Sequence, residues 1–420
     1  MASFSFGAGN AAALLRLPLY VAGRLLTAVI PRSRDEWAFG CAIGVADGAL
    51  ALWEYAAAHG EKAVWLTGSA ADARDAAARG IPAVPKRSIR GFWRTARARV
   101  VVVTHGFGDV NRYATSGAFL VQLWHGIPLK RIGLDTPVTT RSPVRAGGRF
   151  ISALLRVSYR ATQRRIGLIP AASALVRGRL ESAFALPFER VPVTGEPRVD
   201  VLSQGTAAAR RAVARAGIET RVTLPAQSTR LLLYAPTWRD GADDPAGPTP
   251  AQWERLTAML EARDAALLLR SHHLGSRQSH AAHPRIQALD SAVVADVTPL
   301  LPAVDVLITD YSSLAFDAAL VPVATVFFAP DLAAYARSRG FYATYEEVAG
   351  TDFARDWDGV LDDLERVLGD ADERERRLAA ATTLSDRVHR FADGRNTERV
   401  YRAILARRHR GPTPSRDGKE

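Results

Sequence analysis

Three segments of the chain carry side chains whose types and spacing suit acid–base and phosphate chemistry. In the first, His125 follows the apolar, strand-like run Phe119 to Trp124, and Gly126 comes next. A histidine at a strand end can act as a general base, because its unperturbed pKa of about 6.5 lies near neutral pH. The glycine lets another backbone or a ligand approach closely. A histidine that merely ends the strand remains the alternative at this point.

The second segment places another histidine after a strand-like run in the other half of the chain. Arg270 ends the run Leu267 to Leu269, and His272 follows two residues later. Together Arg270 and His272 can neutralise a phosphate and donate hydrogen bonds to it, so we predict that this pair binds a phosphate group. A surface loop would show the same spacing. No carboxylate stands at ligand spacing from the adjacent His273, and no metal site is expected.

The third segment joins a strand end to a helix start. An apolar run ends at Asp310, and Ser312 and Ser313 then open a helix predicted to run through Leu320. Backbone N–H groups and hydroxyls at such a start can bind a pyrophosphate. Asp317, one turn inside the helix, is placed to hold sugar hydroxyls. We predict that Asp310, at the strand end, helps to bind the same phosphate-bearing ligand, the donor of the transferred group. The alternative is an ordinary N-cap serine.

Basic residues gather in the first half of the chain and are interleaved with aromatic side chains. The formal net charge of +12 and the pI near 10.3 predict attraction to polyanions. Anionic lipid head groups or a phosphopolymer would fit such a surface, whereas a plain solvated face is the alternative. A first basic group comprises Lys86, Arg87, Arg90, Arg94, Arg97 and Arg99. The residues assigned to the acceptor or membrane surface are Lys130, Arg131, Arg156, Arg160, Arg164 and Arg165.

The elements that must position these residues alternate between strands and helices. Amphipathic helices are predicted at 47–59 and 252–263, and the predicted buried strands are 63–67, 100–104, 119–124, 191–194, 231–234, 267–270, 293–296, 304–309 and 323–328. This pattern predicts an α/β protein with two Rossmann-like parallel-sheet domains facing a cleft, with ligands at the carboxyl ends of the strands. We expect an N-terminal acceptor and membrane-side domain at 1–205, a C-terminal donor-binding domain at 206–410, and a disordered tail at 411–420.

Composition narrows the class of protein further. A hydrophobic content of 48% with 23% charged residues is typical of a folded globular chain, and a single cysteine excludes an intramolecular disulfide framework. The apolar stretch from Ala11 to Ile30 is interrupted by Arg16, Pro18 and Arg24. It is therefore predicted to lie in a membrane interface or against the protein, in preference to spanning a bilayer or serving as a signal peptide.

Taken together, the segments resemble the CDP-glycerol glycerophosphotransferases of bacterial teichoic acid synthesis. The similar stretches are Val103–Asp135, Val193–Leu202, Leu231–Asp240, Leu267–Gly275 and Ile308–Phe328, in matching order across nearly the whole chain. The resemblance implies a GT-B-like fold, with catalytic roles for His125 and His272 and with Ser312 and Ser313 binding the donor phosphates. Arg239 becomes a further phosphate-binding candidate. The chain departs from the family pattern at Ile127 and His273, which leaves acceptor and donor selectivity open.

The function implied is transfer of glycerol phosphate, or a similar alcohol phosphate, from CDP-glycerol to a hydroxyl of a lipid-linked or polymeric acceptor, with release of CMP. Neither a cofactor nor a nucleic-acid partner is expected. The expected location is the cytoplasmic face of the cell membrane, as a peripheral protein on an anionic surface. Two alternatives remain: a GT-B glycosyltransferase that uses a sugar nucleotide, and a catalytically silent membrane scaffold that binds polyanions.

Overall fold

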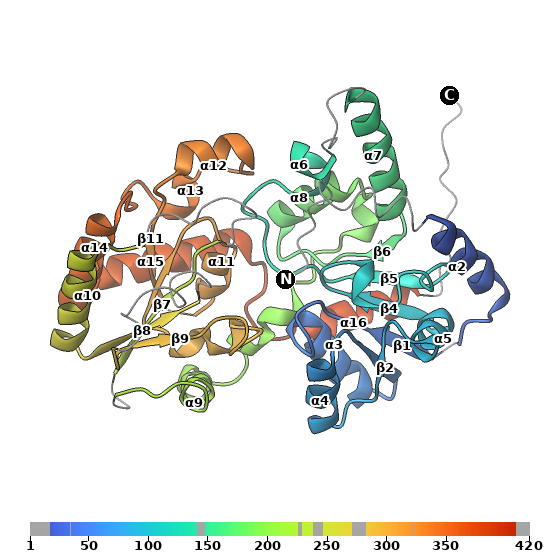
Figure 1. Cartoon of the computed structure of the whole chain (residues 1–420), viewed down its shortest axis with the longest axis horizontal. Coiled ribbons are helices and arrows are strands. Elements are labelled where there is room, and N and C mark those ends of the chain that lie inside the picture. The colour runs from blue at the N-terminus through green and yellow to red at the C-terminus, as the bar shows by residue number, and fades with distance from the viewer. Residues whose placement is uncertain are drawn as a thin grey trace. The chain divides into compact units, whose positions relative to one another are not determined.

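Two compact units make up the chain in the computed structural model (Figure 1). Unit 1 comprises residues 1–125, 133–198 and 395–420, and unit 2 comprises residues 126–132 and 199–394. The structure describes residues 17–33, 35–140, 148–225, 229–237, 247–270, 283–321 and 323–408. The chain therefore changes unit after His125, Ile132, Arg198 and Gly394, instead of passing once from the first to the second.

Unit 1 is built on a six-stranded parallel sheet in the order β3-β2-β1-β4-β5-β6. Its strands are β1 (Glu36–Phe39), β2 (Lys62–Thr67), β3 (Ala83–Pro85), β4 (Val100–Val103), β5 (Phe119–Gln122) and β6 (Ile166–Leu168). Strand β4 is four consecutive valines, all buried, as a central parallel strand covered on both faces requires. The helices are α2 (Leu17–Val29), α3 (Asp47–Ala58), α4 (Ala70–Ala78), α5 (Ile89–Arg97), α6 (Pro137–Thr140), α7 (Gly148–Gln163), α8 (Ala174–Phe184) and α16 (Asn396–Arg407).

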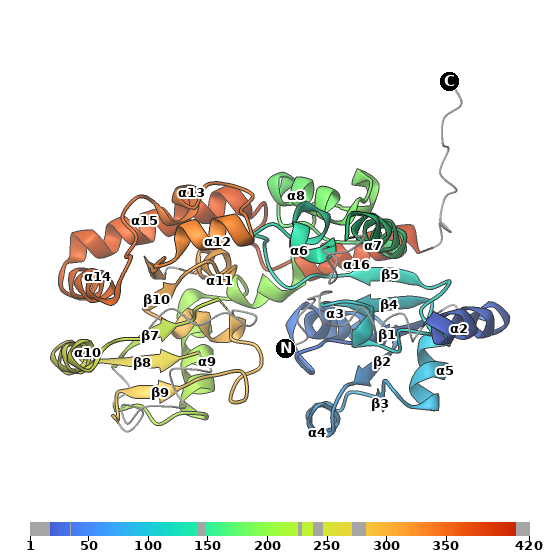
Figure 2. The same ribbon diagram turned by 45° about the horizontal axis from the view of Figure 1, so that its top comes forward.

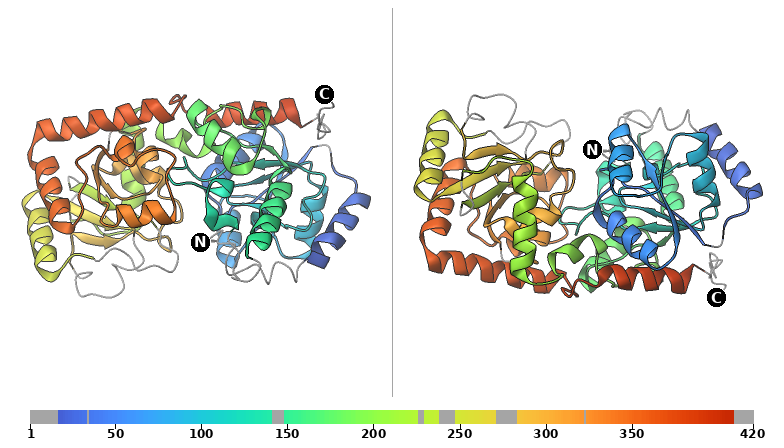
Figure 3. Two further views of the ribbon diagram at one scale, coloured as in Figure 1. Left: turned by 90° about the horizontal axis from the view of Figure 1, so that it is seen from above. Right: turned by 90° about the horizontal axis from the view of Figure 1, so that it is seen from below.

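The C-terminal helix α16 belongs to unit 1 and is drawn in red in Figure 3. Its buried residues Val400, Tyr401 and Ile404 join the core formed by Trp37 of β1 and Leu52 of α3. The expected domain boundary after residue 205, with this helix in the second domain, thus differs from the compact units. An amphipathic helix shows which of its faces is buried but not which sheet it covers.

Unit 2 holds a five-stranded parallel sheet in the order β11-β10-β7-β8-β9. Figure 2 shows β10, β7, β8 and β9 in this order. Its strands are β7 (Arg230–Tyr234), β8 (Ala265–Leu269), β9 (Ile286–Ala288), β10 (Val306–Thr309) and β11 (Ala324–Phe327). The helices are α9 (Ala207–Glu219), α10 (Pro250–Ala262), α11 (Leu314–Ala318), α12 (Leu332–Ser338), α13 (Glu346–Ala349), α14 (Trp357–Gly369) and α15 (Ala371–Val388). Alternate residues of β7 enter separate cores: Leu232 packs with α10 and α14, whereas Leu231 and Leu233 pack with α9.

The prediction of two Rossmann-like parallel-sheet halves is confirmed, although individual elements differ. The strand expected at 293–296 is wrong, because this segment forms turns and β9 lies earlier, at Ile286–Ala288. The strand expected at 191–194 is reduced to a single bridge between Val193 and Ala171. The expected tail at 411–420 lies outside the described residues. Within those residues, no helix combines the length and apolar character needed to cross a membrane.

Candidate active site

In unit 1, the candidate site begins where two neighbouring strands end. Strands β4 and β5 pair in parallel register, with Val103 opposite Gln122, so the residues that follow both strands leave the same edge of the sheet. Trp124 has a φ of 63°, a left-handed conformation that is costly for a residue with a side chain. Its ring packs edge-on against Phe184, with ring centroids 5.1 Å apart. This constrained turn ends the strand and places His125 at the sheet edge.

His125 lies flat against a second histidine that sequence reasoning did not identify. The imidazole rings of His105 and His125 stack with centroids 4.3 Å apart and planes only 4° from parallel. Nδ1 of His125 lies 3.4 Å from the carbonyl oxygen of Thr104, a long contact for a hydrogen bond. Both histidines are half-buried, so each ring keeps part of its surface accessible.

The turn that carries His105 is held by a buried carboxylate. Oδ2 of Asp109 accepts hydrogen bonds from the backbone N–H groups of Thr104, His105 and Gly106, at 3.0, 2.8 and 3.2 Å. Burial lowers the pKa of His105, while Asp109 opposes this effect and Arg198 reinforces it. The imidazole of His105 is therefore neutral at neutral pH.

Three possible metal ligands approach one another beside these histidines. Donor atoms of Cys41, Asp47 and His105 lie within 4.8 Å of one another. Burial strongly raises the pKa of the Cys41 thiol, and the Thr104 hydroxyl lies 3.1 Å from its sulfur. A thiol binds metals through its thiolate form, so a protonated Cys41 is a poor ligand. We therefore interpret Cys41 and Asp47 as polar neighbours of His105 and not as a metal site.

In unit 2, Asp310 joins two strand-end loops. The side chain is almost fully buried, and Oδ1 accepts hydrogen bonds from the backbone N–H groups of Thr237, at 2.7 Å, and Tyr311, at 2.6 Å. The hydroxyl of Tyr345 donates to the carbonyl oxygen of Asp310 at 3.1 Å. Asp310 therefore shapes the turn that precedes the two serines, while its predicted contact with the donor stays a prediction.

The two predicted serines lie at the start of α11, which ends at Ala318 instead of continuing to Leu320. Ser312 Oγ accepts a hydrogen bond from the N–H of Leu314 at 3.3 Å, whereas the side chain of Ser313 makes no capping hydrogen bond. Both serines are half-buried. Asp317, predicted to hold sugar hydroxyls, is only 1% exposed and so lies beneath this surface.

Thr237 is a candidate that sequence reasoning missed. Its hydroxyl is buried and has no hydrogen-bond partner among the described residues, although its backbone is fixed by Asp310. Burying a hydroxyl without a partner is unfavourable, and a bound ligand would supply one. The available signal was its position in the Tyr-Ala-Pro-Thr-Trp-Arg segment that follows β7, of which only Arg239 was singled out.

Arg270 is engaged with backbone carbonyl groups. Its guanidinium donates to the carbonyl oxygens of Leu289, Val294 and Ala295 at 3.3, 2.8 and 3.0 Å. Burial lowers the pKa of Arg270, with Asp296 and Asp290 opposing the effect. These contacts hold the loop after β9, and phosphate binding by Arg270 stays a prediction. His272 and Arg239 lie outside the described residues.

The basic residues assigned to an acceptor or membrane surface divide between the units. Lys130 forms an antiparallel bridge with Phe341 in unit 2, where the side chain of Arg131 donates to the Phe341 carbonyl oxygen at 3.1 Å. Arg165 is half-buried in unit 1, where a side-chain nitrogen lies 2.5 Å from the Thr115 hydroxyl. The exposed members of the set in unit 1 are Arg156, Arg160 and Arg164.

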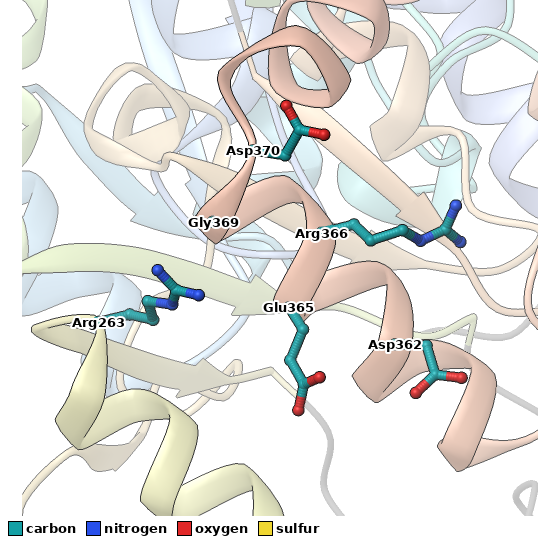
Figure 4. A pocket seen from close by; sticks show the side chains of 6 residues that line it. All are labelled: Arg263, Asp362, Glu365, Arg366, Gly369 and Asp370. Carbon is teal, nitrogen blue, oxygen red and sulfur yellow. The ribbon is translucent and has the colours of Figure 1, made fainter.

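A pocket of about 550 Å³ lies elsewhere in unit 2 (Figure 4). Arg263 precedes β8, which puts the pocket at the amino end of that strand, whereas Thr237 and Ser312 follow carboxyl ends. This pocket is therefore not the donor site assigned from the sequence. Its lining residues are Arg263, Asp362, Glu365, Arg366, Gly369 and Asp370.

Comparison with known proteins gives consistent findings. A family model described as CDP-glycerol:poly(glycerophosphate) glycerophosphotransferase matches residues 38–406. A teichoic acid glycerol-phosphate transferase of Staphylococcus aureus is 26% identical over 332 residues, which cover 77% of this chain and 80% of that protein. A teichoic acid poly(glycerol phosphate) polymerase of Staphylococcus epidermidis is 34% identical over 239 residues, which cover 54% of this chain but only 31% of that protein. The solved structure of the wall teichoic acid polymerase TagF has a similar fold, with a TM-score of 0.71 at 21% identity and 94% of each chain covered.

Proposed function

Because the chain belongs to the CDP-glycerol:poly(glycerophosphate) glycerophosphotransferase family, we propose that it transfers glycerol phosphate from CDP-glycerol to a hydroxyl group of a lipid-linked or polymeric acceptor in teichoic acid synthesis. The observation that carries this proposal is the family match over residues 38–406, which includes the strand-end loops of both units. The chemistry is that of a transferase: a substituted phosphate group moves from a nucleotide to an alcohol.

The reaction requires one proton acceptor and several groups that stabilise phosphate charge. An acceptor oxygen forms a bond to the β-phosphorus, His125 takes the hydroxyl proton, and the bond from that phosphorus to the bridging oxygen breaks so that CMP leaves. In unit 2, the hydroxyls of Thr237, Ser312 and Ser313 are the proposed donors of hydrogen bonds to the nucleotide phosphates. Phosphoryl transfer depends mainly on positioning and charge stabilisation, which these groups provide.

Nucleotide release tests this function. The whole chain is incubated with CDP-glycerol, CDP-ribitol or UDP-sugars, with and without a lipid-linked glycerol-phosphate acceptor. We expect CMP from CDP-glycerol, released faster when the acceptor is present. The CDP-ribitol arm matters because a ribitol-phosphate polymerase of Staphylococcus aureus is 26% identical over 298 residues. Release of UDP would instead support a glycosyltransferase, and no release from any donor would support a silent scaffold.

We further propose that unit 1 binds anionic membranes peripherally through helix α7. Its residues are all exposed or half-buried, and Phe150 is 77% exposed, Leu154 59% and Val157 64%. These residues recur at the spacing of one helical face, and Arg156 and Arg160 lie on the same helix. An apolar stripe bordered by arginines is typical of helices that lie in the membrane interface.

Helix α2 extends the proposed membrane surface. One side of this helix is attached to unit 1, where Gly23 lies against Tyr113 and the Tyr20 and Tyr113 rings are 4.9 Å apart. Outside that contact, Leu25 is 67% exposed and Val29 is 78% exposed. Apolar side chains left in water in this way are accounted for by a lipid surface, which supports the expected peripheral location.

A further inference from the structure

The stacking of His105 on His125 follows from the order of the strands. Strands β4 and β5 are neighbours in the sheet but separated along the chain, and each ends shortly before one of the two histidines. With planes 4° apart and centroids at 4.3 Å, the rings meet face to face. Hydrogen bonds of an imidazole lie in its plane, so this contact constrains the ring without using either nitrogen of His125.

His105 is itself held in place from two directions. Its Nδ1 lies 2.8 Å from the hydroxyl of Thr104, and its backbone N–H donates to Asp109 at 2.8 Å. The same Thr104 hydroxyl lies 3.1 Å from the sulfur of Cys41, which is buried behind it. A ring fixed both through its nitrogen and through its backbone can limit the rotation of a second ring stacked on it.

The charge of His105 decides whether this contact can assist proton transfer. Two protonated imidazoles stacked face to face would repel each other, so a charged His105 would oppose protonation of His125. Among the residues that the structure describes, the titratable or charged groups that face His105 are Cys41, Asp47, Asp109, His125 and Arg198. Burial is the largest influence and lowers the pKa of His105, which leaves the ring neutral while its neighbour gains a proton.

We propose that His105 is a positioning residue, which holds the imidazole of His125 by face-to-face stacking in the orientation needed to accept the proton of the acceptor hydroxyl. This inference rests on the proposed function of His125 as the general base. His105 touches neither the phosphate nor the acceptor in this role, and it acts only through the plane and charge of its ring.

Two substitutions separate stacking from other roles. His105→Phe keeps a flat ring but cannot titrate, whereas His105→Leu removes the flat face while keeping an apolar side chain. In the CMP-release assay we expect kcat of His105→Phe within about threefold of the wild type, and kcat of His105→Leu lower by about tenfold, with KM for CDP-glycerol unchanged in both. His59→Ala is the matched control, because His59 also stacks on an aromatic ring in unit 1, that of Tyr55 at 4.1 Å, outside the site.

Wild-type kcat in His105→Leu would overturn the proposal, and so would a His105→Phe variant as slow as His105→Leu, since stacking alone would then not explain the effect. A second measurement needs no substrate and so separates this inference from the proposed function. In NMR titration of the imidazole signals of the whole chain, assigned with His105→Phe and His125→Asn, we expect the pKa of His105 to lie below that of an ordinary histidine. A His105 pKa at or above the ordinary value would contradict the proposal.

Discussion

The carboxylate of Asp310 accepts a hydrogen bond from the backbone N–H of Thr237 at 2.7 Å, joining the loop after β10 to the loop after β7. Because β7 and β10 are adjacent parallel strands, this bond connects two loops at the same edge of the sheet. The residues proposed to bind the donor in unit 2 therefore share one buried carboxylate as a common support.

Removal of that support should lower stability. Asp310→Ala leaves the N–H groups of Thr237 and Tyr311 without their buried acceptor, and each unpaired group costs about 1–3 kcal/mol. We expect a fall of that order in the free energy of unfolding, measured by urea denaturation, together with weaker donor binding. Asp358→Ala, an exposed position on α14, serves as the control and should change stability by less than about 0.5 kcal/mol. Equal free energies of unfolding for the two variants would show that the hydrogen bonds of Asp310 contribute nothing to stability.

The catalytic histidines should affect turnover while leaving the fold intact. His125→Ala and His272→Ala are each expected to lower kcat for CMP release by at least about a hundredfold, the usual contribution of a positioned acid or base. Circular dichroism checks that each variant is folded. A folded variant with near-normal kcat would remove that histidine from the mechanism.

Thr237→Val should change stability and donor binding in opposite directions. The valine fills the same space but removes a buried hydroxyl that has no partner among the described residues, so stability should stay the same or rise. Loss of one hydrogen bond to the nucleotide should raise the Kd for CDP-glycerol, measured by titration calorimetry, by up to about tenfold. Thr220→Val, at an exposed position, should leave Kd unchanged. An unchanged Kd in Thr237→Val would place the phosphates elsewhere.

The two serines should contribute to the same affinity. The double variant Ser312→Ala with Ser313→Ala removes both hydroxyls at the start of α11. The Ser312 hydroxyl accepts a hydrogen bond from the N–H of Leu314, whereas the Ser313 side chain makes no capping hydrogen bond. We expect Kd for CDP-glycerol to rise by roughly tenfold or more, with KM rising in parallel. If calorimetry gives the wild-type Kd, the serines are only part of the turn.

Membrane binding should depend on both charge and apolar contact. Changing Arg156, Arg160 and Arg164 to Glu removes attraction of about 1 kcal/mol per residue near an anionic surface and adds repulsion. Co-sedimentation with anionic liposomes should fall sharply, most of all at low salt. The double variant Phe150→Ser with Leu154→Ser should reduce the liposome binding that persists at high salt, because it removes exposed apolar side chains of α7. The control changes exposed arginines of unit 2 to Glu, namely Arg221, Arg337 and Arg374.

Equal binding to neutral and anionic liposomes at every salt concentration would contradict a role for these arginines. Unchanged binding in both the arginine and the apolar variants would exclude α7 as the membrane surface.

Local pattern was sufficient to predict the two parallel sheets and the position of His125 after a strand. Buried runs such as the four valines of β4 are evident in the sequence, and polar residues that follow them must emerge at the sheet edge. His105 follows β4 in the same way, but its contact with His125 depends on β4 and β5 being neighbours, which local pattern does not determine. The hydrogen bonds from Arg270 to backbone carbonyl groups could not be predicted from the sequence either, because they depend on the path of the loop after β9.

The repeated crossing of the chain between units has a consequence for its synthesis. The ribosome begins with residues of unit 1. However, the core of unit 1 includes Val400, Tyr401 and Ile404 of α16, which are synthesised only after every residue of unit 2. The N-terminal domain of a growing chain usually folds first. Here unit 2 can be completed while the apolar surface around Trp37 and Leu52 still lacks its covering helix. During translation, unit 1 is therefore the part exposed longest to chaperones and proteases, although most of it is made first.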